Sequence, residues 1–223
     1  NDRKVGMVFP GWAQSGKTMI ADRLVKNRGW KFISEDFCII SNGELSSFPK
    51  QRRVYASQLN DTLYDSISRP LSKRIPDKIN LRLLTTLGFL GITPMRILSV
   101  DEIFFPDDLS QTAKLRAIVF LMRGDFDTLD SCQVESEKMA NMCADMMFFE
   151  MQNFSGFYEL LSSYGVFSGT SDLVNKVIID TREIYYRTFR DVQCYILKIP
   201  NTDDLQSLEN AMNLRLVEMI RDR

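Results

Sequence analysis

The sequence predicts an α/β fold in which helices flank a mixed β-sheet. A short apolar run at 5–9 precedes a glycine-rich loop, and the segment 19–26 that follows has apolar residues at helical spacing. The run 115–122 is rich in β-branched and large apolar residues, as a buried strand requires. Most of the chain from 136 onward carries the period of amphipathic helices. Strands and helices mixed in this way favour a sheet covered by helices.

The first half of the chain begins as strand, loop, helix, strand and hairpin. The helix 19–26 is followed by a basic stretch and Gly29, which is a common helix end. A second strand is expected at 30–33. The apolar run 37–40 leads into Asn42-Gly43, a typical hairpin turn. Further expected elements are a proline-containing loop at 68–76, a strand or buried helix at 81–90, a strand at 95–100 and a polar loop or short helix at 107–113.

The second half is expected to be mainly helical. Methionines and a cysteine recur at spacings of three and four in 136–149, which is typical of an adaptable core-facing helix. Other helices are expected at 153–164, 171–190 and 205–220, and a late strand at 193–199 is followed by Pro200. Because no repeat, low-complexity stretch or linker is visible, 1–223 is expected to form a single domain.

A complete Walker A motif, Gly-x-x-x-x-Gly-Lys-Thr, lies between the first strand and the first helix. Its glycines let successive backbone N–H groups surround a phosphate, and the following helix places its positive end on the same anion. Lys17 can reach the β- and γ-phosphates, and the Thr18 hydroxyl can bind Mg²⁺. The sequence therefore predicts a site for ATP and Mg²⁺ formed by Gly11, Trp12, Ala13, Gln14, Ser15, Gly16, Lys17, Thr18 and Met19.

Two acids, Glu35 and Asp36, follow the expected second strand. The carboxyl ends of strands line the ligand crevice of a doubly wound sheet. A carboxylate there can accept a proton from an attacking hydroxyl, or hold Mg²⁺ directly or through water. Both acids and Lys17 are candidate catalytic residues, and both acids join Thr18 as candidate metal ligands. The alternative is a pair of solvated acids at a strand end.

Other charged residues have weaker signals. The segment 97–102 resembles a Walker B strand ending at Asp101 and Glu102, which in an ATPase would organise Mg²⁺ and activate water. Apolar strands followed by acids are common, so an ordinary strand end is the default explanation. Arg52-Arg53 and Arg123 are cations that could stabilise phosphate charge, with surface solvation as the default for each.

Composition excludes several classes of chemistry. The sequence has no histidine, which excludes Ser-His-Asp and Cys-His sites and His-ligated zinc. Lys plus Arg is 28 and Asp plus Glu is 29, so a broad nucleic-acid or anionic-membrane surface is not expected. Four cysteines without a CxxC pair predict reduced, mostly buried thiols and a cytoplasmic protein. No apolar run is long enough for a membrane helix.

The Walker A motif, the segment 28–37, the turn Asn42-Gly43 and Phe48-Pro49 together resemble the HPr kinase/phosphorylase-like branch of P-loop proteins. This branch is related to phosphoenolpyruvate carboxykinase. The likeness covers most of the chain in order and spacing, and 1–50 is its specific part. It implies a P-loop mixed sheet and phosphorylation of a hydroxyl with ATP and Mg²⁺. One acid after the second strand would act as base while its neighbour helps to hold the metal.

Two departures from that family affect the expected roles. Glu35 stands where the family commonly has Asp, so the division of work between the two acids stays open, with Asp36 favoured as base. The family usually has more chain before the first strand, and residue 1 is Asn, so a preceding segment also stays open.

The expected function is therefore a kinase that transfers the γ-phosphoryl group of ATP to a hydroxyl of a small molecule or of a Ser side chain in a protein. The alternatives are a nucleotide-binding regulatory module and an ATPase that uses Asp101 and Glu102. The oligomeric state stays open, a homo-oligomer included.

Overall fold

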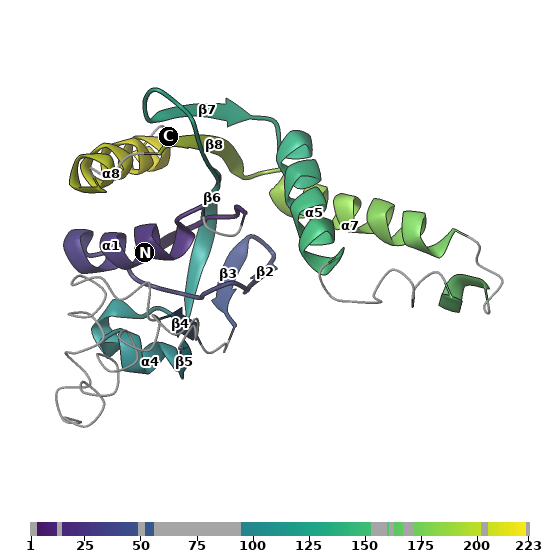
Figure 1. Ribbon diagram of the computed structural model, residues 1–223, viewed down its shortest axis with the longest axis horizontal. Coiled ribbons are helices and arrows are strands. Elements are labelled where there is room, and N and C mark those ends of the chain that lie inside the picture. The colour runs from purple at the N-terminus through teal and green to yellow at the C-terminus, as the bar shows by residue number, and fades with distance from the viewer. Residues whose placement is uncertain are drawn as a thin grey trace, which may run out of the picture. The chain divides into compact units, whose positions relative to one another are not determined.

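The computed structural model describes residues 4–12, 15–48, 52–55, 95–152, 160, 163–166, 172–201 and 205–221. These residues form a mixed open sheet flanked by helices, as an α/β fold requires (Figure 1). Contacts divide the chain into two compact units. The first unit comprises Asn1–Lys17, Ser41–Gly43 and Lys114–Arg223, and the second comprises Thr18–Ile40 and Glu44–Ala113.

The centre of the sheet is β6 (Thr112–Gly124). It pairs in parallel with β1 (Val5–Val8), with Val5 opposite Lys114 and Val8 opposite Ile118. It also pairs in parallel with β8 (Gln193–Pro200), which in turn pairs antiparallel with β7 (Asp130–Val134). The segment 117–121 of β6 is at most 2% exposed, so this strand forms the core of the first unit.

The other strands of the six-stranded sheet form a hairpin, and the order along the sheet is β2-β3-β6-β8-β7. In this hairpin, β2 (Cys38–Ser41) and β3 (Glu44–Ser47) are joined by Asn42 and Gly43, which have φ angles of 50° and 72°. Two consecutive residues in the left-handed region match the twist of a two-residue hairpin turn. The expected hairpin is confirmed.

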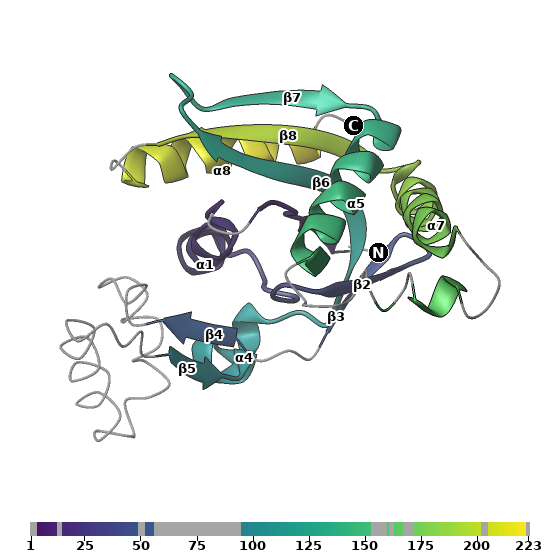
Figure 2. The same ribbon diagram turned by 45° about the vertical axis from the view of Figure 1, so that its right-hand side comes forward.

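The long helices described in the first unit are α5 (Ser136–Gln152), α7 (Leu173–Phe189) and α8 (Leu205–Arg221). Figures 1 and 2 both show α8 running along β8 and α5 beside α7. The buried side chains of α5 are Met139, Ala140, Cys143, Ala144 and Phe148. Met139 confirms the expectation that this helix turns a methionine toward the core, and all three helices confirm the predicted positions.

The second unit contains α1 (Lys17–Arg28) from Thr18 onward, α4 (Val100–Ile103) and the 3-10 helix η4 (Pro106–Asp108). It also contains β4 (Arg52–Tyr55) and β5 (Met95–Leu98), which pair antiparallel as a separate two-stranded sheet. Its core cluster consists of Val25, Phe32, Ile103 and Phe104.

Several predictions of local structure are wrong. The segment 30–33 is not a strand: of these residues only Phe32 pairs, in a single parallel bridge with Leu109, the residue that follows η4. The strand expected at 95–100 ends at Leu98, and Asp101 and Glu102 lie in α4. The predictions for 68–76 and 81–90, and most of that for 153–164, lie outside the described residues.

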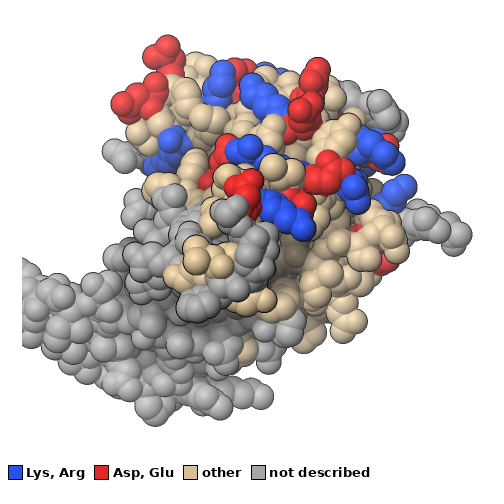
Figure 3. Space-filling model, turned by 90° about the vertical axis from the view of Figure 1, so that its right-hand side faces the viewer, with Lys and Arg blue, Asp and Glu red and all other residues tan. Residues whose placement is uncertain are grey.

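The described surface carries mixed charge. Figure 3 shows Lys and Arg interspersed with Asp and Glu on the face that it presents, which agrees with the balanced composition. Among the helices that the structure describes, none is long and apolar enough to cross a membrane.

Candidate functional site

The glycine-rich loop begins directly beside β6. Gly11 bridges Leu121 in parallel, and the Leu121 N–H donates to the Pro10 carbonyl at 2.8 Å. A Cβ at position 11 would lie 2.8 Å from Ser15 Oγ and 2.9 Å from the Leu121 carbonyl oxygen, so only glycine fits there. Gly16 has a φ of 90°, in the left-handed region that favours glycine. The backbone of the loop therefore requires glycine at both positions.

Lys17 is held against the loop. Its Nζ donates to the carbonyl oxygens of Gly11 at 2.6 Å and of Trp12 at 2.7 Å. The ammonium group therefore stays beside the loop instead of extending into solvent. Such a position suits a cation that contacts phosphates bound by the loop.

Ser15 is a buried residue of the described part of the loop. Its side chain is only 5% exposed, and among the described residues Ser15 Oγ has no hydrogen-bond partner. An unsatisfied buried hydroxyl is costly and calls for an explanation. A phosphate oxygen in the loop would accept its hydrogen.

Trp12 and Met19 lie on either side of Ser15, Gly16, Lys17 and Thr18 in the sequence. Trp12 is 41% exposed, and its ring packs edge-on against Phe149 of α5 with centroids 5.0 Å apart. Met19 lies in the first turn of α1 and is half-buried. Ala13 and Gln14 lie outside the described residues.

The structure brings together two residues that the sequence proposed as metal ligands. Thr18 Oγ1, in the first turn of α1, donates to Glu35 Oε1 at 3.1 Å. Both groups carry oxygen atoms, which are the ligands that Mg²⁺ prefers, and they lie close enough to bind one ion. Glu35 is therefore placed next to the Walker A threonine, although 17 positions separate them in the sequence.

Packing of α1 explains this contact. Thr18, Ala21 and Val25 lie on one face of the helix because their spacings are three and four. Ala21 and Val25 pack in the cluster that contains Phe32 and Phe104, whose rings stack with centroids 4.6 Å apart. Glu35 follows Phe32 by three residues, so the core anchors the backbone that leads to it.

Hydrogen bonds fix the same backbone. The Phe32 N–H donates to the Asp108 carbonyl at 2.7 Å, and the Ser110 N–H donates to the Phe32 carbonyl at 2.8 Å. Ser34 Oγ then donates to the Phe37 carbonyl and accepts the Phe48 N–H at 3.0 Å. The turn that carries both acids is thus tied at each end.

The two acids have different surroundings. Glu35 is half-buried and contacts Thr18, whereas Asp36 is exposed. The Glu35 carboxylate thus accepts a hydrogen bond from the threonine of the loop, whereas the Asp36 side chain faces solvent. This difference favours separate roles for the two groups.

Asp101 and Glu102 do not have the position of Walker B acids. The strand before them, β5, pairs with β4 and does not belong to the six-stranded sheet. The strand that runs parallel to β1 is β6, and the first acid after it is Asp125. Arg52 and Arg53 lie in β4, and their side chains are outside the described part of the chain.

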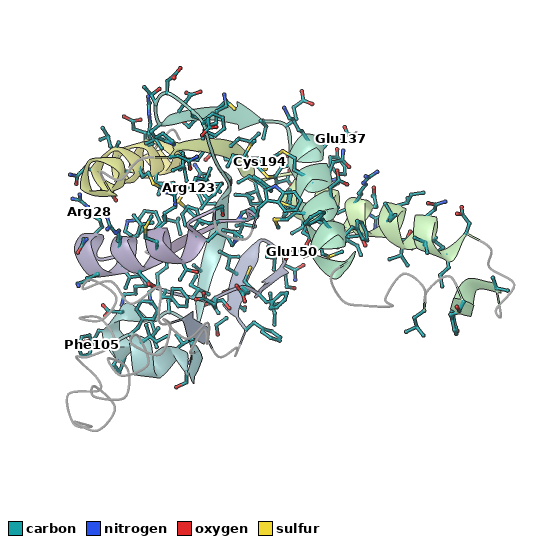
Figure 4. The ribbon with its side chains drawn as sticks, in the orientation of Figure 1. Arg28, Phe105, Arg123, Glu137, Glu150 and Cys194 are labelled. Carbon is teal, nitrogen blue, oxygen red and sulfur yellow. The ribbon has the colours of Figure 1, made fainter. Side chains whose placement is uncertain are left out.

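The carboxyl ends of β6 and β8 carry a polar network that the sequence analysis missed. Arg123 Nε donates to Asn201 Oδ1 at 3.2 Å, and Asn201 Nδ2 donates to Asp125 Oδ1 at 3.0 Å. The Asn201 N–H also donates to the Gly124 carbonyl at 3.1 Å. Figure 4 labels Arg123 at this end of β6. The network depends on the pairing of β6 with β8, which no local pattern reveals.

The donor set around Thr18 fits Mg²⁺ rather than a transition metal. Among the described residues, there is no group of three or more His, Cys, Asp or Glu side chains that could hold a metal ion. Mg²⁺ does not need such a group, because it keeps several waters and binds through one or two carboxylates and substrate phosphates. Thr18 and Glu35 could supply the protein's share of its ligands.

The four cysteines differ in burial. All four are free thiols: Cys143 and Cys194 are buried, Cys38 is half-buried and Cys132 is exposed. Burial, with the nearby Cys194, raises the pKa of Cys143 to about 12, and burial raises the pKa of Cys194 to about 11. The buried pair is therefore protonated and unreactive at neutral pH.

Comparison of the chain with protein-family models, with curated proteins and with solved structures finds no match. The functional assignment accordingly depends on the geometry of the loop and of the acidic turn.

Proposed function

We propose that the chain is a kinase of the HPr kinase/phosphorylase-like kind, which uses ATP and Mg²⁺ to phosphorylate a hydroxyl of a small molecule or of a Ser side chain. The observation that carries the proposal is the contact between Thr18 and Glu35, directly after the glycine-rich loop. A phosphate-binding loop alone is compatible with many reactions. An acid already paired with the loop's threonine adds the second protein donor that a metal-bound nucleotide needs.

The loop would bind the phosphates of ATP. Backbone N–H groups at the start of α1 would point toward an anion there, and Ser15 Oγ, which has no partner among the described residues, would supply a hydroxyl donor. Lys17 Nζ would contact the terminal phosphates from its place beside Gly11 and Trp12. Thr18 and Glu35 would hold Mg²⁺, which would supply positive charge to the bound nucleotide.

Asp36 would orient the acceptor. The acceptor oxygen attacks the γ-phosphorus while the bond from phosphorus to the β–γ bridging oxygen breaks, so ADP leaves with the electron pair. The proton of the acceptor hydroxyl passes to the Asp36 carboxylate. Because the transition state is loose, this acid acts chiefly by positioning the hydroxyl and takes the proton late.

Phosphoryl transfer can be tested directly. The full chain is incubated with Mg²⁺ and ATP labelled in the γ-phosphate, together with a panel of hydroxyl compounds and Ser-containing polypeptides. Label on an acceptor supports the proposal. Release of labelled phosphate without transfer indicates an ATPase, and binding without turnover indicates a regulatory module; either result would contradict the kinase.

A binding readout accompanies this assay. The chain has two tryptophans, so Trp30→Phe leaves Trp12, within the loop, as the sole indole reporter. We expect Lys17→Ala to abolish tight ATP binding, since charged hydrogen bonds are worth about 1.5–3 kcal/mol each. Lys26→Ala, which removes an exposed lysine of the same helix, is the matched control.

A further inference from the structure

We propose that Arg123 binds the terminal phosphate of the nucleotide in the loop and thereby distinguishes ATP from ADP. This inference rests on the proposed function, because it assumes that the loop binds ATP. It assigns a role to a residue outside the Walker A motif and outside the acidic turn.

The position of Arg123 relative to the loop follows from strand register. Gly11 and Leu121 are paired in a parallel bridge, and a Cβ on Gly11 would lie 3.3 Å from Leu121 Cβ, so both positions face the same side of the sheet. That Cβ would also contact Ser15 Oγ, so the loop folds over this side. Arg123 is two residues beyond Leu121 in a continuous strand and lies on the same face.

Arg123 also lies at the end of the strand where ligands are expected. The strands β1, β6 and β8 are parallel, so their carboxyl ends share one edge with the start of the loop. Ligands of open α/β sheets bind outside this edge. Arg123, two residues beyond the Gly11 bridge, is therefore nearer to this edge of the sheet than the residue that opens the loop.

One hydrogen bond orients the guanidinium group of Arg123. Its Nε is held by Asn201, which Asp125 and the Gly124 carbonyl hold in turn. In the part of the chain that the structure describes, the bond to Asn201 is the one hydrogen bond that Arg123 makes. The two Nη groups are therefore left for a ligand.

An arginine anchored through Nε presents its Nη groups as a planar fork. This fork matches two oxygens of a phosphate, which a lysine cannot contact in the same way. The terminal phosphate gains most from such a contact, because its three oxygens share the charge that develops during transfer. We therefore assign the contact to the terminal phosphate, because the loop itself would surround the β-phosphate.

The test compares the two nucleotides. ATP and ADP are titrated with Mg²⁺ into the full chain and into Arg123→Ala, with calorimetry as the readout. We expect the ATP dissociation constant of the variant to rise by roughly 10- to 100-fold, the range for one charge-assisted contact, with ADP within about threefold. A role limited to stability would not change the ratio of the two affinities.

Three further variants complete the test. Arg123→Lys keeps the charge without the fork and should lose part of the discrimination. Asn201→Ala frees the guanidinium and should lower ATP affinity in the same direction by a smaller factor. Arg187→Ala removes an exposed arginine of α7 and should leave both affinities unchanged.

The outcomes separate the two proposals. Suppose that the wild-type chain binds ATP. If the Arg123 variants bind ATP and ADP with wild-type affinity, or if their affinities for ATP and ADP fall by the same factor, this inference alone is overturned. A wild-type chain that binds neither nucleotide would overturn the proposed function, and the inference with it.

Discussion

At the scale of single residues, the glycine that opens the loop has a steric role that can be measured. A methyl group at Gly11 would overlap Ser15 Oγ and the Leu121 carbonyl, so Gly11→Ala should lower the free energy of unfolding by roughly 1–3 kcal/mol. Gly124→Ala is the matched control, because its Cβ would meet the Phe126 ring at an ordinary 3.4 Å. We expect a change within about 0.5 kcal/mol there. Equal losses in urea denaturation would contradict this explanation.

The two acids of the turn should separate in their kinetic effects. Asp36→Asn removes the proton acceptor and should lower turnover by roughly 10²–10⁴-fold. ATP affinity should stay within about tenfold, since an orienting group acts mainly in the transition state. Glu35→Gln should instead weaken the Mg²⁺-dependent part of ATP binding, because Glu35 contacts Thr18.

The controls for these variants are acids of the same chain. Asp101→Asn and Glu102→Gln should leave turnover nearly unchanged, since α4 does not continue a strand of the six-stranded sheet. Steady-state kinetics and ATP titrations with and without Mg²⁺ give all four comparisons. Full activity in both Asp36→Asn and Glu35→Gln would remove the mechanism proposed above.

The buried thiols predict a loss of stability at alkaline pH. The pKa of Cys143 is raised from 9.0 to about 12 because its thiol is buried, so the folded state keeps a proton that the unfolded state releases. The free energy of unfolding therefore has its full thiol contribution below 9.0 and loses it as pH rises toward about 12. The urea midpoint should fall between about pH 8 and about pH 10, and the fall should be smaller in Cys143→Ala than in wild type. An equal decline in both would contradict the assignment.

At the scale of elements, the packing between α1 and the segment before the acids is the main support of the Thr18–Glu35 contact. Phe32→Ala removes a buried ring from this cluster and should cost about 3–5 kcal/mol of stability. Where the variant still folds, Mg²⁺-dependent ATP binding should weaken, because the acidic turn loses its anchor. Phe37→Ala, on the same turn but 59% exposed, should cost far less. Comparable losses in the two denaturation curves would contradict this role for the cluster.

Elements with a strong local pattern were predictable from the sequence. The strand at 115–122, the helix at 136–149 and the hairpin turn at Asn42-Gly43 each depend on residues close together in the chain, and each is present. By contrast, β7 is polar along most of its length and lies at an edge of the sheet, so it has no apolar period to detect. The segment 30–33 fails for a different reason: it is apolar enough for a strand, but only Phe32 finds a partner.

The site shows the same division between local and distant information. The Walker A motif is contiguous, so Gly11, Gly16 and Lys17 could be identified without a structure. The contact between Glu35 and Thr18 depends on a core formed by α1, α4 and the segment around Phe32. From the sequence, Glu35 could be named only as one of two candidate metal ligands. Arg123 and Asn201 are 78 positions apart and meet through strand pairing, so their link could not be predicted.

At the scale of the whole molecule, the two compact units are interleaved along the chain. The boundaries fall between Lys17 and Thr18 within α1, between Ile40 and Ser41 within β2, between Gly43 and Glu44 at the start of β3, and between Ala113 and Lys114 within β6. No single cut in the chain separates one unit from the other. Since helices and strands form cooperatively, disorder on one side of such a boundary removes hydrogen bonds on the other.

Cooperative unfolding of the whole chain follows from this arrangement, and the two tryptophans allow a test. Trp12 belongs to the first unit and Trp30 to the second, so Trp30→Phe and Trp12→Phe each leave a reporter in one unit. For each variant, we expect the urea midpoint measured by fluorescence to equal the midpoint measured by far-ultraviolet circular dichroism. Coincident midpoints from two probes are the signature of a two-state transition. Circular dichroism of each variant also controls for any stability change that the substitution itself causes. Fluorescence midpoints that depart from the circular dichroism midpoint in opposite directions would show that the units unfold separately, and the expectation of one domain would then be wrong.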